Sequence, residues 1–293
     1  MNVLSLFDGI SCGKVALDRV GININKYFSS EICKNAIKCS EQNHPNIIKL
    51  GDITNWKNWD LPKIDLIIGG SPCQDFSQAK AILSVKNGLG GDKSKLFYQY
   101  LEILRTIKCY NPNIKFLLEN VKMSKNSEKQ LNNYLGVDGV HINSKLLSYQ
   151  NRPRIYWTNI GKIDQPYDKN ISFQDYIDTD INYCKKFKVN NTPSRKKMWG
   201  DGVGRGNLKS CKNVTNADKI NCLTLKQDRS PNSGLIEFDN FCRYLTTNEL
   251  EQAQNLPKGY TSMLSKNQSE KVLGNGWTVD VIAHIFKDLK KVK

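Results

Sequence analysis

Two residues of this 293-residue chain could carry out covalent and acid–base chemistry. Cys73 stands directly after Pro72 and just past the apolar run Ile64–Ile68, which is typical of a buried strand. A thiol exposed at the carboxyl end of such a strand lies where open α/β sheets carry out their chemistry, although most free cysteines are small packing residues. Glu119 ends another apolar run, where a carboxyl group could hold or release a proton. An isolated glutamate is more often a surface residue.

A second set of residues could bind a ligand that contains a nucleoside. Phe7-Asp8-Gly9 ends the first apolar run, and a small residue there lets a ligand approach the backbone. Glu31 and Asp52 follow the second and third runs. A carboxylate at the end of the second strand is placed to accept hydrogen bonds from ribose hydroxyls. Each carboxylate alone would be a surface residue, but as a pair at successive strand ends they favour ligand binding.

A parallel sheet would bring these residues to one edge. Short apolar runs alternate with helical patterns through the first half of the chain, which indicates βαβ units and a doubly wound, Rossmann-like α/β fold. The predicted strands are Asn2–Phe7, Lys26–Ser30, Ile47–Leu50, Ile64–Ile68, Lys115–Glu119, Asn143–Ser148 and Arg154–Asn159. The predicted helices of this part are Lys14–Val20, Asn35–Asn43, Leu96–Lys108 and Ser127–Tyr134.

The sequence changes character after about Lys162, which predicts a smaller, loop-rich second domain. Lys, Asn, Gly and Ser dominate there, with basic clusters at Lys185-Lys186 and Arg195-Lys196-Lys197 and four glycines in Gly200–Gly206. Helical pattern resumes at Thr247–Asn255, behind Thr246 as a capping residue, and again at Val279–Leu289.

Composition limits the classes of partner and site. Lys and Arg total 43 against 28 acidic residues, a net charge of +15, which favours a polyanion such as nucleic acid. No apolar stretch reaches about 18 residues and no secretory signal opens the chain, so we expect a cytoplasmic protein without a membrane anchor. Nine cysteines without paired spacing and three isolated histidines predict neither a disulfide scaffold nor a metal site.

Several short motifs occur in a fixed order along the chain. They are Val3–Gly13, Glu31, Asp52, Pro72-Cys73-Gln74, Phe116–Val121, Gln150–Arg154 and Gly274-Asn275-Gly276-Trp277. In this order they resemble the motifs of bacterial and phage DNA (cytosine-5)-methyltransferases. The resemblance runs from the first residues to about Phe286, except for a variable stretch after Gly161.

The resemblance implies four catalytic residues: Cys73, Glu119, Arg152 and Arg154. The Cys73 thiolate would add to C6 of a cytosine flipped out of the duplex, so that C5 can attack a methyl group. Glu119 would hold the proton at N3. Arg154 would bind the cytosine carbonyl, while Arg152 would support the catalytic loop or Glu119. Phosphate contact or solubility is the alternative role of both arginines, and for Arg152 it explains the residue about equally well.

S-adenosylmethionine is the cofactor that the resemblance implies, without a metal ion. Glu31 would bind its ribose, Asp52 its adenine amino group, and Asn275 would complete the site. Ser11 and Cys12 stand where the family usually has more glycine. The implied cofactor-binding residues are Phe7, Asp8, Gly9, Glu31, Ile32, Asp52, Ile53, Pro72, Asn275 and Trp277.

The resemblance also divides the chain into two functional domains. Residues 1–161 and 270–293 would form the catalytic, cofactor-binding domain, and 162–269 the target-recognition domain. Ser71–Lys95 would close as a lid over double-stranded DNA. The implied DNA-binding residues are Gln74, Ser77, Arg195, Lys196, Arg205 and Thr224. The recognised site, a cognate restriction endonuclease, the choice between monomer and dimer, and bacterial or phage origin stay open.

Three other functions compete with this one. An RNA methyltransferase of the same fold would act on tRNA cytosine, and a catalytically inactive relative would only bind DNA. Cys73, Glu119 and Arg154 together argue against the inactive relative, because a binding protein has no need of that set. An amino-methylating DNA enzyme would need an Asp/Asn-Pro-Pro-aromatic loop, whereas this chain has Ser71-Pro72-Cys73.

Overall fold

The computed structural model describes residues 1–71, 94–190, 192–193, 213–229, 232–238 and 241–291. The chain forms two compact units, and each is described by itself. Unit 1 comprises residues 1–142, 153–165 and 282–293, and unit 2 comprises 143–152 and 166–281. The predicted catalytic and target-recognition domains, divided at residues 161/162 and 269/270, are defined by function and stay a prediction.

A seven-stranded sheet organises unit 1, with the strand order β3-β2-β1-β4-β5-β8-β6. β1 pairs in parallel with both β2 and β4, and β5 pairs in parallel with β4 but antiparallel with β8. The doubly wound α/β fold is therefore confirmed. The strands are β1 (Asn2–Leu6), β2 (Lys26–Ser30), β3 (Ile48–Lys49), β4 (Leu66–Gly69), β5 (Lys115–Val121), β6 (Val140–Asn143) and β8 (Pro153–Thr158).

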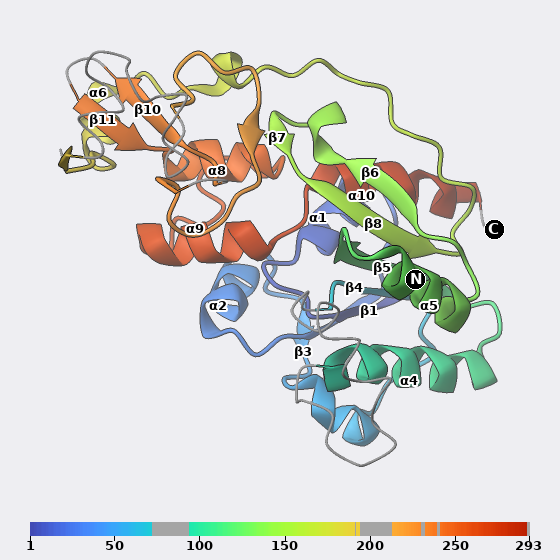
Figure 1. The fold of residues 1–293 in the computed structure, drawn as a ribbon. Helices are drawn as coiled ribbons and strands as arrows, with labels where there is room; N and C mark the ends of the chain where they lie inside the picture. Colours follow the sequence, from blue (N-terminus) through green and yellow to red (C-terminus); the bar gives the residue numbers. More distant parts are fainter. Residues whose placement is uncertain (72–93, 191, 194–212, 230–231, 239–240, 292–293) are drawn as a thin grey trace, which may run out of the picture. The chain divides into compact units, whose positions relative to one another are not determined.

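Helices cover both faces of this sheet (Figure 1). α1 and α2 lie on one face, and α4 and α5 lie on the other, as right-handed crossovers on either side of β1 require. The helices and 3₁₀ turns of unit 1 are α1 (Cys12–Arg19), α2 (Lys34–Asn43), η1 (Ile53–Asn58), α4 (Ser94–Tyr110), α5 (Lys125–Leu135) and η5 (Lys287–Lys291), and α10 (Val279–Phe286) is shared with unit 2.

The two faces of the central strands differ in chemistry. Alternation along β1 and β2 sends Leu4, Leu6 and Phe28 into the large apolar cluster that includes the buried face of α4. The opposite face of the same strands carries hydroxyl side chains, with Ser5, Tyr27 and Ser29 all at most 2 % exposed. Buried polar groups need hydrogen-bond partners, and these three find one at the end of β1.

Unit 2 combines short strands with helices. β10 and β11 form an antiparallel pair, while β7 and β9 pair in parallel. The side chains of Thr246 and Glu249 cap α8 reciprocally, as Thr246 in the sequence predicts. The elements are η3 (Ser144–Leu146), β7 (Gln150–Asn151), η4 (Phe173–Tyr176), α6 (Ile181–Lys185), β9 (Ile220–Asn221), β10 (Leu235–Phe238), β11 (Phe241–Tyr244), α8 (Thr247–Ala253) and α9 (Lys266–Asn275).

One predicted strand was wrong, and one helix was missed. Residues Asn143–Ser148 do not form a strand: β6 ends at Asn143, whose side chain accepts a hydrogen bond from the Lys145 amide and starts the 3₁₀ turn η3. Local side-chain capping of this kind competes with a strand. The helix α9 was not predicted, although Ser265 and Gln268 form a capping box at its start.

Among the described residues, no helix combines the length and apolar character needed to cross a membrane.

Candidate active site

The carboxyl ends of β1, β2 and β3 are joined by hydrogen bonds. The Asp8 amide donates to the Ser30 carbonyl oxygen at 3.1 Å, and the Gly9 amide donates to Glu31 Oε2 at 2.8 Å. Ser30 Oγ donates to the Gly51 carbonyl oxygen at 2.8 Å, beside Asp52. Three of the segments predicted to bind the cofactor therefore lie together at one edge of the sheet, as the ends of parallel strands require.

Glu31 organises this edge. Its Oε2 binds the Gly9 amide, and its Oε1 accepts from the amides of Ile32 and Cys33 at 2.9 and 2.8 Å. A carboxylate offers about four acceptor positions, so Glu31 keeps capacity for a ligand hydroxyl. The Ile32 side chain beside it is 69 % exposed, and a Cβ added to Gly9 would meet no atom within 4 Å. A carboxylate, an exposed apolar side chain and an open backbone fit the ribose and base of an adenosine ligand.

The other cofactor predictions have mixed placements. Asp52 Oδ1 accepts from the Thr54 amide at 2.9 Å and caps η1, which leaves Oδ2 for a ligand. The Ile53 side chain is 4 % exposed and belongs to the apolar cluster, so only its backbone could meet a ligand. Phe7 is partly buried against the same cluster. Asp8 directs its carboxylate into the protein, as described below.

Glu119 and Arg154 form an ion pair in unit 1. Glu119 lies opposite Tyr156 in the antiparallel register, and Arg154 lies opposite Val121, two residues away along the strand. Diagonal neighbours of this kind share a face of the sheet, and Arg154 Nε lies 2.9 Å from Glu119 Oε1. Both side chains are largely buried, at 13 % and 10 % exposure. The guanidinium therefore fixes the orientation of the carboxyl group.

Asn120 attaches the end of β4 to this site. Its Nδ2 donates to the carbonyl oxygen of Ser71 at 3.3 Å and to Ser71 Oγ at 3.1 Å. Ser71 directly precedes Pro72 and Cys73 in the chain. The sequence offered a signal, since Asn120 belongs to the Glu119-Asn120-Val121 motif, but we assigned it no role. Asn120, which follows Glu119, thus holds Ser71, the residue two positions before Cys73.

Of the two partners predicted for Arg152, the catalytic loop lies outside the described residues, and Glu119 is held by another arginine. The Arg152 guanidinium donates to the carbonyl oxygens of Gly274 and Gly276 at 3.1 and 2.8 Å and contacts Cys222 Sγ at 3.2 Å, all within unit 2. Arg154, and not Arg152, pairs with Glu119. Arg152 therefore stabilises the Gly274–Trp277 motif, because its buried guanidinium can satisfy several carbonyl groups at once.

Gln150, two residues before Arg152, also holds backbone groups of unit 2. Its Oε1 accepts from the Leu223 amide at 3.0 Å, and its Nε2 donates to the Ala253 carbonyl oxygen at 3.1 Å. Thr224, predicted to bind DNA, follows Leu223 and is exposed. Gln150 thus holds Leu223, the residue before Thr224, while Arg152 holds the Gly274–Trp277 motif. Asn275 is the exposed last residue of α9, and Trp277 is half-buried.

Several predicted site residues lie outside the described residues: Pro72, Cys73, Gln74, Ser77, Arg195, Lys196 and Arg205. The predicted lid Ser71–Lys95 and the Gly200–Gly206 loop fall largely or wholly there as well. In the part of the chain that the structure describes, no group of three His, Cys, Asp or Glu side chains gathers as a metal site.

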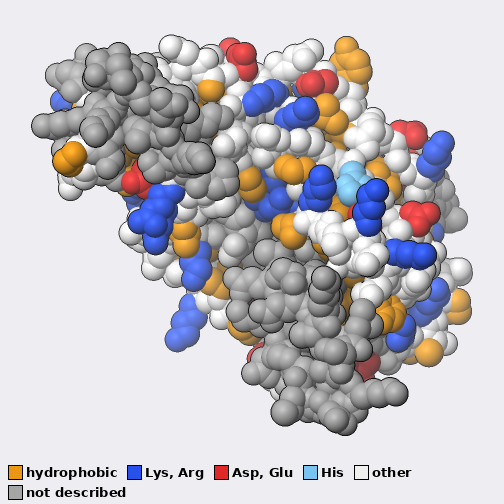
Figure 2. All heavy atoms as spheres, viewed as in Figure 1, with side chains coloured by type: hydrophobic (Ala, Val, Ile, Leu, Met, Phe, Trp, Pro, Cys, Tyr) orange, Lys and Arg blue, Asp and Glu red, His pale blue; other side chains and the backbone are white. Residues whose placement is uncertain are grey.

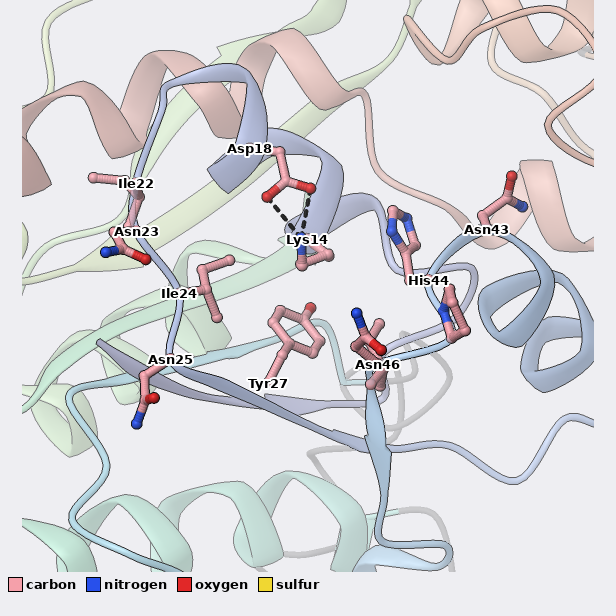
Figure 3. A pocket seen from close by; sticks show the side chains of 12 residues that line it. Lys14, Asp18, Ile22, Asn23, Ile24, Asn25, Tyr27, Asn43, His44 and Asn46 are labelled. Carbon is pink, nitrogen blue, oxygen red and sulfur yellow. Dashed lines mark hydrogen bonds and ion pairs between the residues drawn. The ribbon is translucent and has the colours of Figure 1, made fainter.

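A polar cavity of about 490 Å³ lies at the opposite end of β2 from Glu31. Side chains from α1, from the loop before β2 and from the loop after α2 point into it (Figure 3). Lys14 and Asp18 pair across one wall at 2.6 Å, and burial lowers the pKa of His44. None of the predicted site residues lines this cavity. Tyr27 does line it, and its hydroxyl group donates to Asp8.

Lys and Arg side chains are spread over the face shown in Figure 2, with fewer acidic ones between them. This distribution agrees with the net charge of +15. A surface of this kind attracts polyanions by neutralising phosphate groups and releasing counterions.

A family model described as C-5 cytosine-specific DNA methylase matches residues 1–291. The chain belongs to this family. The resemblance found in the sequence is therefore confirmed.

Relatives of the family extend over different shares of the chain. The type II methyltransferase M.NlaX of Neisseria lactamica is 27 % identical over 309 residues, covering 99 % of this chain and 96 % of that protein. The orphan methyltransferase M.Rho11sI of Bacillus phage rho11s is 35 % identical over 171 residues, covering 53 % of this chain but only 32 % of that longer protein. The Schizosaccharomyces pombe Dnmt2 methyltransferase structure matches with a TM-score of 0.76 at 17 % identity, covering 100 % of this chain and 99 % of that one, and shows the shared fold.

Proposed function

We propose that this protein is an S-adenosylmethionine-dependent DNA (cytosine-5)-methyltransferase that modifies a specific site in double-stranded DNA. The observation that carries the proposal is the buried Glu119–Arg154 pair beside Asn120, which holds the chain two residues before Cys73. A family member that only bound nucleic acid would gain nothing from a buried, oriented carboxyl group beside the residue that holds Ser71.

The proposed reaction begins on the cytosine ring. C5 and C6 are inaccessible inside the duplex, so the base must be flipped out. The Cys73 thiolate forms a bond to C6, and the ring electrons move toward N3, where the Glu119 carboxyl group supplies a proton. The Arg154 guanidinium keeps Glu119 in place and would also bind the cytosine carbonyl. When bound, S-adenosylmethionine supplies the methyl group that C5 takes up and is left as S-adenosylhomocysteine. N3 then returns its proton to Glu119, and water takes the C5 proton. The C5–H electron pair forms the C5=C6 bond as the S–C6 bond breaks, which restores the Cys73 thiolate.

The donor site that we propose uses residues at the ends of β1, β2 and β3. Glu31 would accept a hydrogen bond from a ribose hydroxyl with its remaining acceptor position, and Ile32 would cover one side of the base. Asp52 would accept from the adenine amino group through Oδ2. Backbone groups at Phe7 and Gly9 would meet the methionine part. Pro72, Asn275 and Trp277 stay part of the proposal on sequence grounds.

The basic character of the chain supports nucleic acid as the substrate but does not choose between DNA and RNA. We favour DNA because the family model and M.NlaX both carry DNA-methylase or type II methyltransferase names. Residues 162–269 would then read the target, with Arg195, Lys196 and Arg205 on phosphates and Thr224 near the bases. tRNA is the second substrate that we test.

The test uses a cytosine analogue that stops the reaction midway. Duplex DNA with 5-fluorocytosine in place of cytosine is incubated with tritiated S-adenosylmethionine, and the products are separated under denaturing conditions. Fluorine at C5 cannot leave as a proton does, so a labelled protein–DNA adduct accumulates. We expect the adduct with the wild-type protein and none with Cys73→Ala, while Cys73→Ser still binds DNA.

Each other outcome changes the assignment. An adduct with fluorocytosine-substituted tRNA but not with DNA would move the activity to RNA. An adduct that survives Cys73→Ala would remove Cys73 from the nucleophile role. No adduct with either substrate, together with DNA binding, would identify a catalytically inactive binding protein.

A further inference from the structure

The Asp8 carboxylate is surrounded by four hydroxyl groups. Oδ1 accepts from Ser5 Oγ at 2.6 Å and from Tyr27 OH at 2.8 Å. Oδ2 accepts from Ser11 Oγ at 2.5 Å and from Ser29 Oγ at 2.8 Å. All four donor residues are at most 2 % exposed. Four hydrogen bonds fill the acceptor capacity of a carboxylate, so Asp8 has no lone pair directed at a ligand.

The network continues to a lysine on the third strand. Ser11 Oγ and Ser40 Oγ lie 2.6 Å apart, and Lys49 Nζ donates to Ser40 Oγ at 2.6 Å. Burial lowers the pKa of Lys49, and the negative charge of Asp8 opposes that shift. Asp8 therefore links β1 and β2 to α1, α2 and β3 through one set of buried polar groups. Such a network is rigid when every member has a partner.

The network holds an unusual backbone conformation. Phe7, Gly9 and Ser11 have φ angles of 57°, 59° and 62°. The left-handed region is unfavourable for residues with a Cβ atom, and it persists only where the surroundings impose it. Asp8 lies between Phe7 and Gly9 and accepts from the Ser11 side chain, and its carbonyl oxygen accepts from the Ser11 amide at 3.1 Å. The contacts of Asp8 with buried hydroxyl groups thus hold the Phe7–Ser11 turn in place.

We propose that Asp8 is a positioning residue for the methyl donor: it keeps the Phe7–Ser11 turn in the left-handed shape that presents Gly9 and Glu31 to the ligand. The inference rests on the proposed function of this edge of the sheet. In this role Asp8 acts on the ligand through the turn, whereas the sequence led us to expect direct contact between Asp8 and the cofactor. The ligand class is a nucleoside thioether or sulfonium, whose ribose would meet Glu31 while its amino-acid part would lie along the turn.

The test compares donor binding in two charge-matched variants. Asp8→Asn keeps the shape of the side chain but offers one oxygen and an NH₂ donor, so at least two hydroxyl groups lose their acceptor. Asp65→Asn is the control, because Asp65 Oδ2 accepts from the Asn2 amide at 2.7 Å at the opposite end of β1. Affinity for S-adenosylhomocysteine is measured by calorimetry without nucleic acid, alongside the melting temperature and DNA affinity.

We expect Asp8→Asn to weaken S-adenosylhomocysteine binding about 10- to 100-fold, the size of losing one or two hydrogen bonds to a carboxylate. The KM for the donor should rise accordingly, while kcat at saturating donor and DNA affinity stay within about threefold of wild type. Asp65→Asn should leave donor affinity unchanged. Tyr27→Phe removes one donor and keeps the ring, so it should weaken binding about two- to tenfold even if Asp8→Asn does not fold.

The outcomes separate this inference from the proposed function. Wild-type protein that binds no S-adenosylhomocysteine would reject the donor site as a whole. Wild-type binding that neither Asp8→Asn nor Tyr27→Phe weakens would overturn the positioning role alone. Equal weakening by Asp65→Asn would also overturn it, because the effect would then follow general destabilisation of the sheet.

Discussion

Asn120→Ala tests how β5 positions the chain that leads to Cys73. Asn120 and Ser71 are 1 % and 5 % exposed, and one amide group donates to two Ser71 oxygens. Leaving a buried acceptor without its donor costs about 1–3 kcal/mol. If the displaced segment carries that loss into the transition state, kcat falls by about 5- to 150-fold, since about 1.4 kcal/mol corresponds to a tenfold change in rate.

The assay is single-turnover methyl transfer from tritiated S-adenosylmethionine at saturating donor and DNA. Asn111→Ala is the matched control: Asn111 is also buried, and its Nδ2 donates to the Ile64 carbonyl oxygen at 2.7 Å, just before the start of β4. We expect similar losses of melting temperature in the two variants, but a slow methyl-transfer rate only in Asn120→Ala. The affinity for S-adenosylhomocysteine should stay at the wild-type value in both.

A wild-type rate for Asn120→Ala would refute the reasoning, because the anchor would then have no influence on the cysteine segment. An equally slow Asn111→Ala would also refute it, since the loss would follow the stability of β4 as a whole. A third variant, Ser71→Ala, strengthens the comparison. It removes only the hydroxyl acceptor, so its rate should lie between those of Asn120→Ala and the wild type.

Three further predictions follow from other contacts. Glu119→Gln should lower kcat by several orders of magnitude because the amide cannot supply a proton at N3, and a loss under about tenfold in the same transfer assay would remove Glu119 from the acid role. DNA affinity should fall steeply between about 50 and 200 mM salt, as phosphate contacts predict; a flat response in a titration would contradict binding through the basic surface. Burial raises the pKa of Glu270, and the positive charge of Lys266 partly offsets that rise. The charged carboxylate is therefore unfavourable in the folded protein. The free energy of unfolding falls as the pH rises from the pKa of Glu270 in the unfolded chain to its higher pKa in the folded protein. Glu270→Gln should therefore raise the melting temperature at pH 8 and have little effect near pH 4, and calorimetry showing the reverse would refute this.

The sheet could be predicted because its strands are apolar runs with helical segments between them. β2 matched its predicted bounds, and β1 and β5 differ by two residues or fewer at one end. The prediction failed where local side-chain hydrogen bonds compete with the apolar pattern, as at Asn143, whose side chain accepts from the Lys145 amide and ends β6. A pattern of hydrophobicity contains no information about such caps.

The positions of the site residues could be predicted, but not their partners. A carboxylate that follows an apolar run must lie at a strand end. Glu31 accordingly accepts from the Gly9 amide, and Asp52 follows Gly51, whose carbonyl oxygen accepts from Ser30 Oγ. Residues two apart along a strand share a face, so alternation does not distinguish Arg152 from Arg154. Arg152 precedes β8, and only the antiparallel register, with Val121 opposite Arg154, decides which of the two meets Glu119.

Asp8 shows the same limit most clearly. Its place after β1 is that of a ligand-binding carboxylate, and only the buried hydroxyl groups of three separate segments decide that it faces inward. The sequence did contain a sign of this arrangement, because Ser5 interrupts the apolar run of β1 and Ser29 and Ser30 end β2. Buried hydroxyl groups need acceptors, so serines at alternating positions of adjacent buried strands predict a shared polar partner on that face. In a chain where such serines flank a strand-end carboxylate, the carboxylate should be expected to support the loop before it is assigned to the ligand.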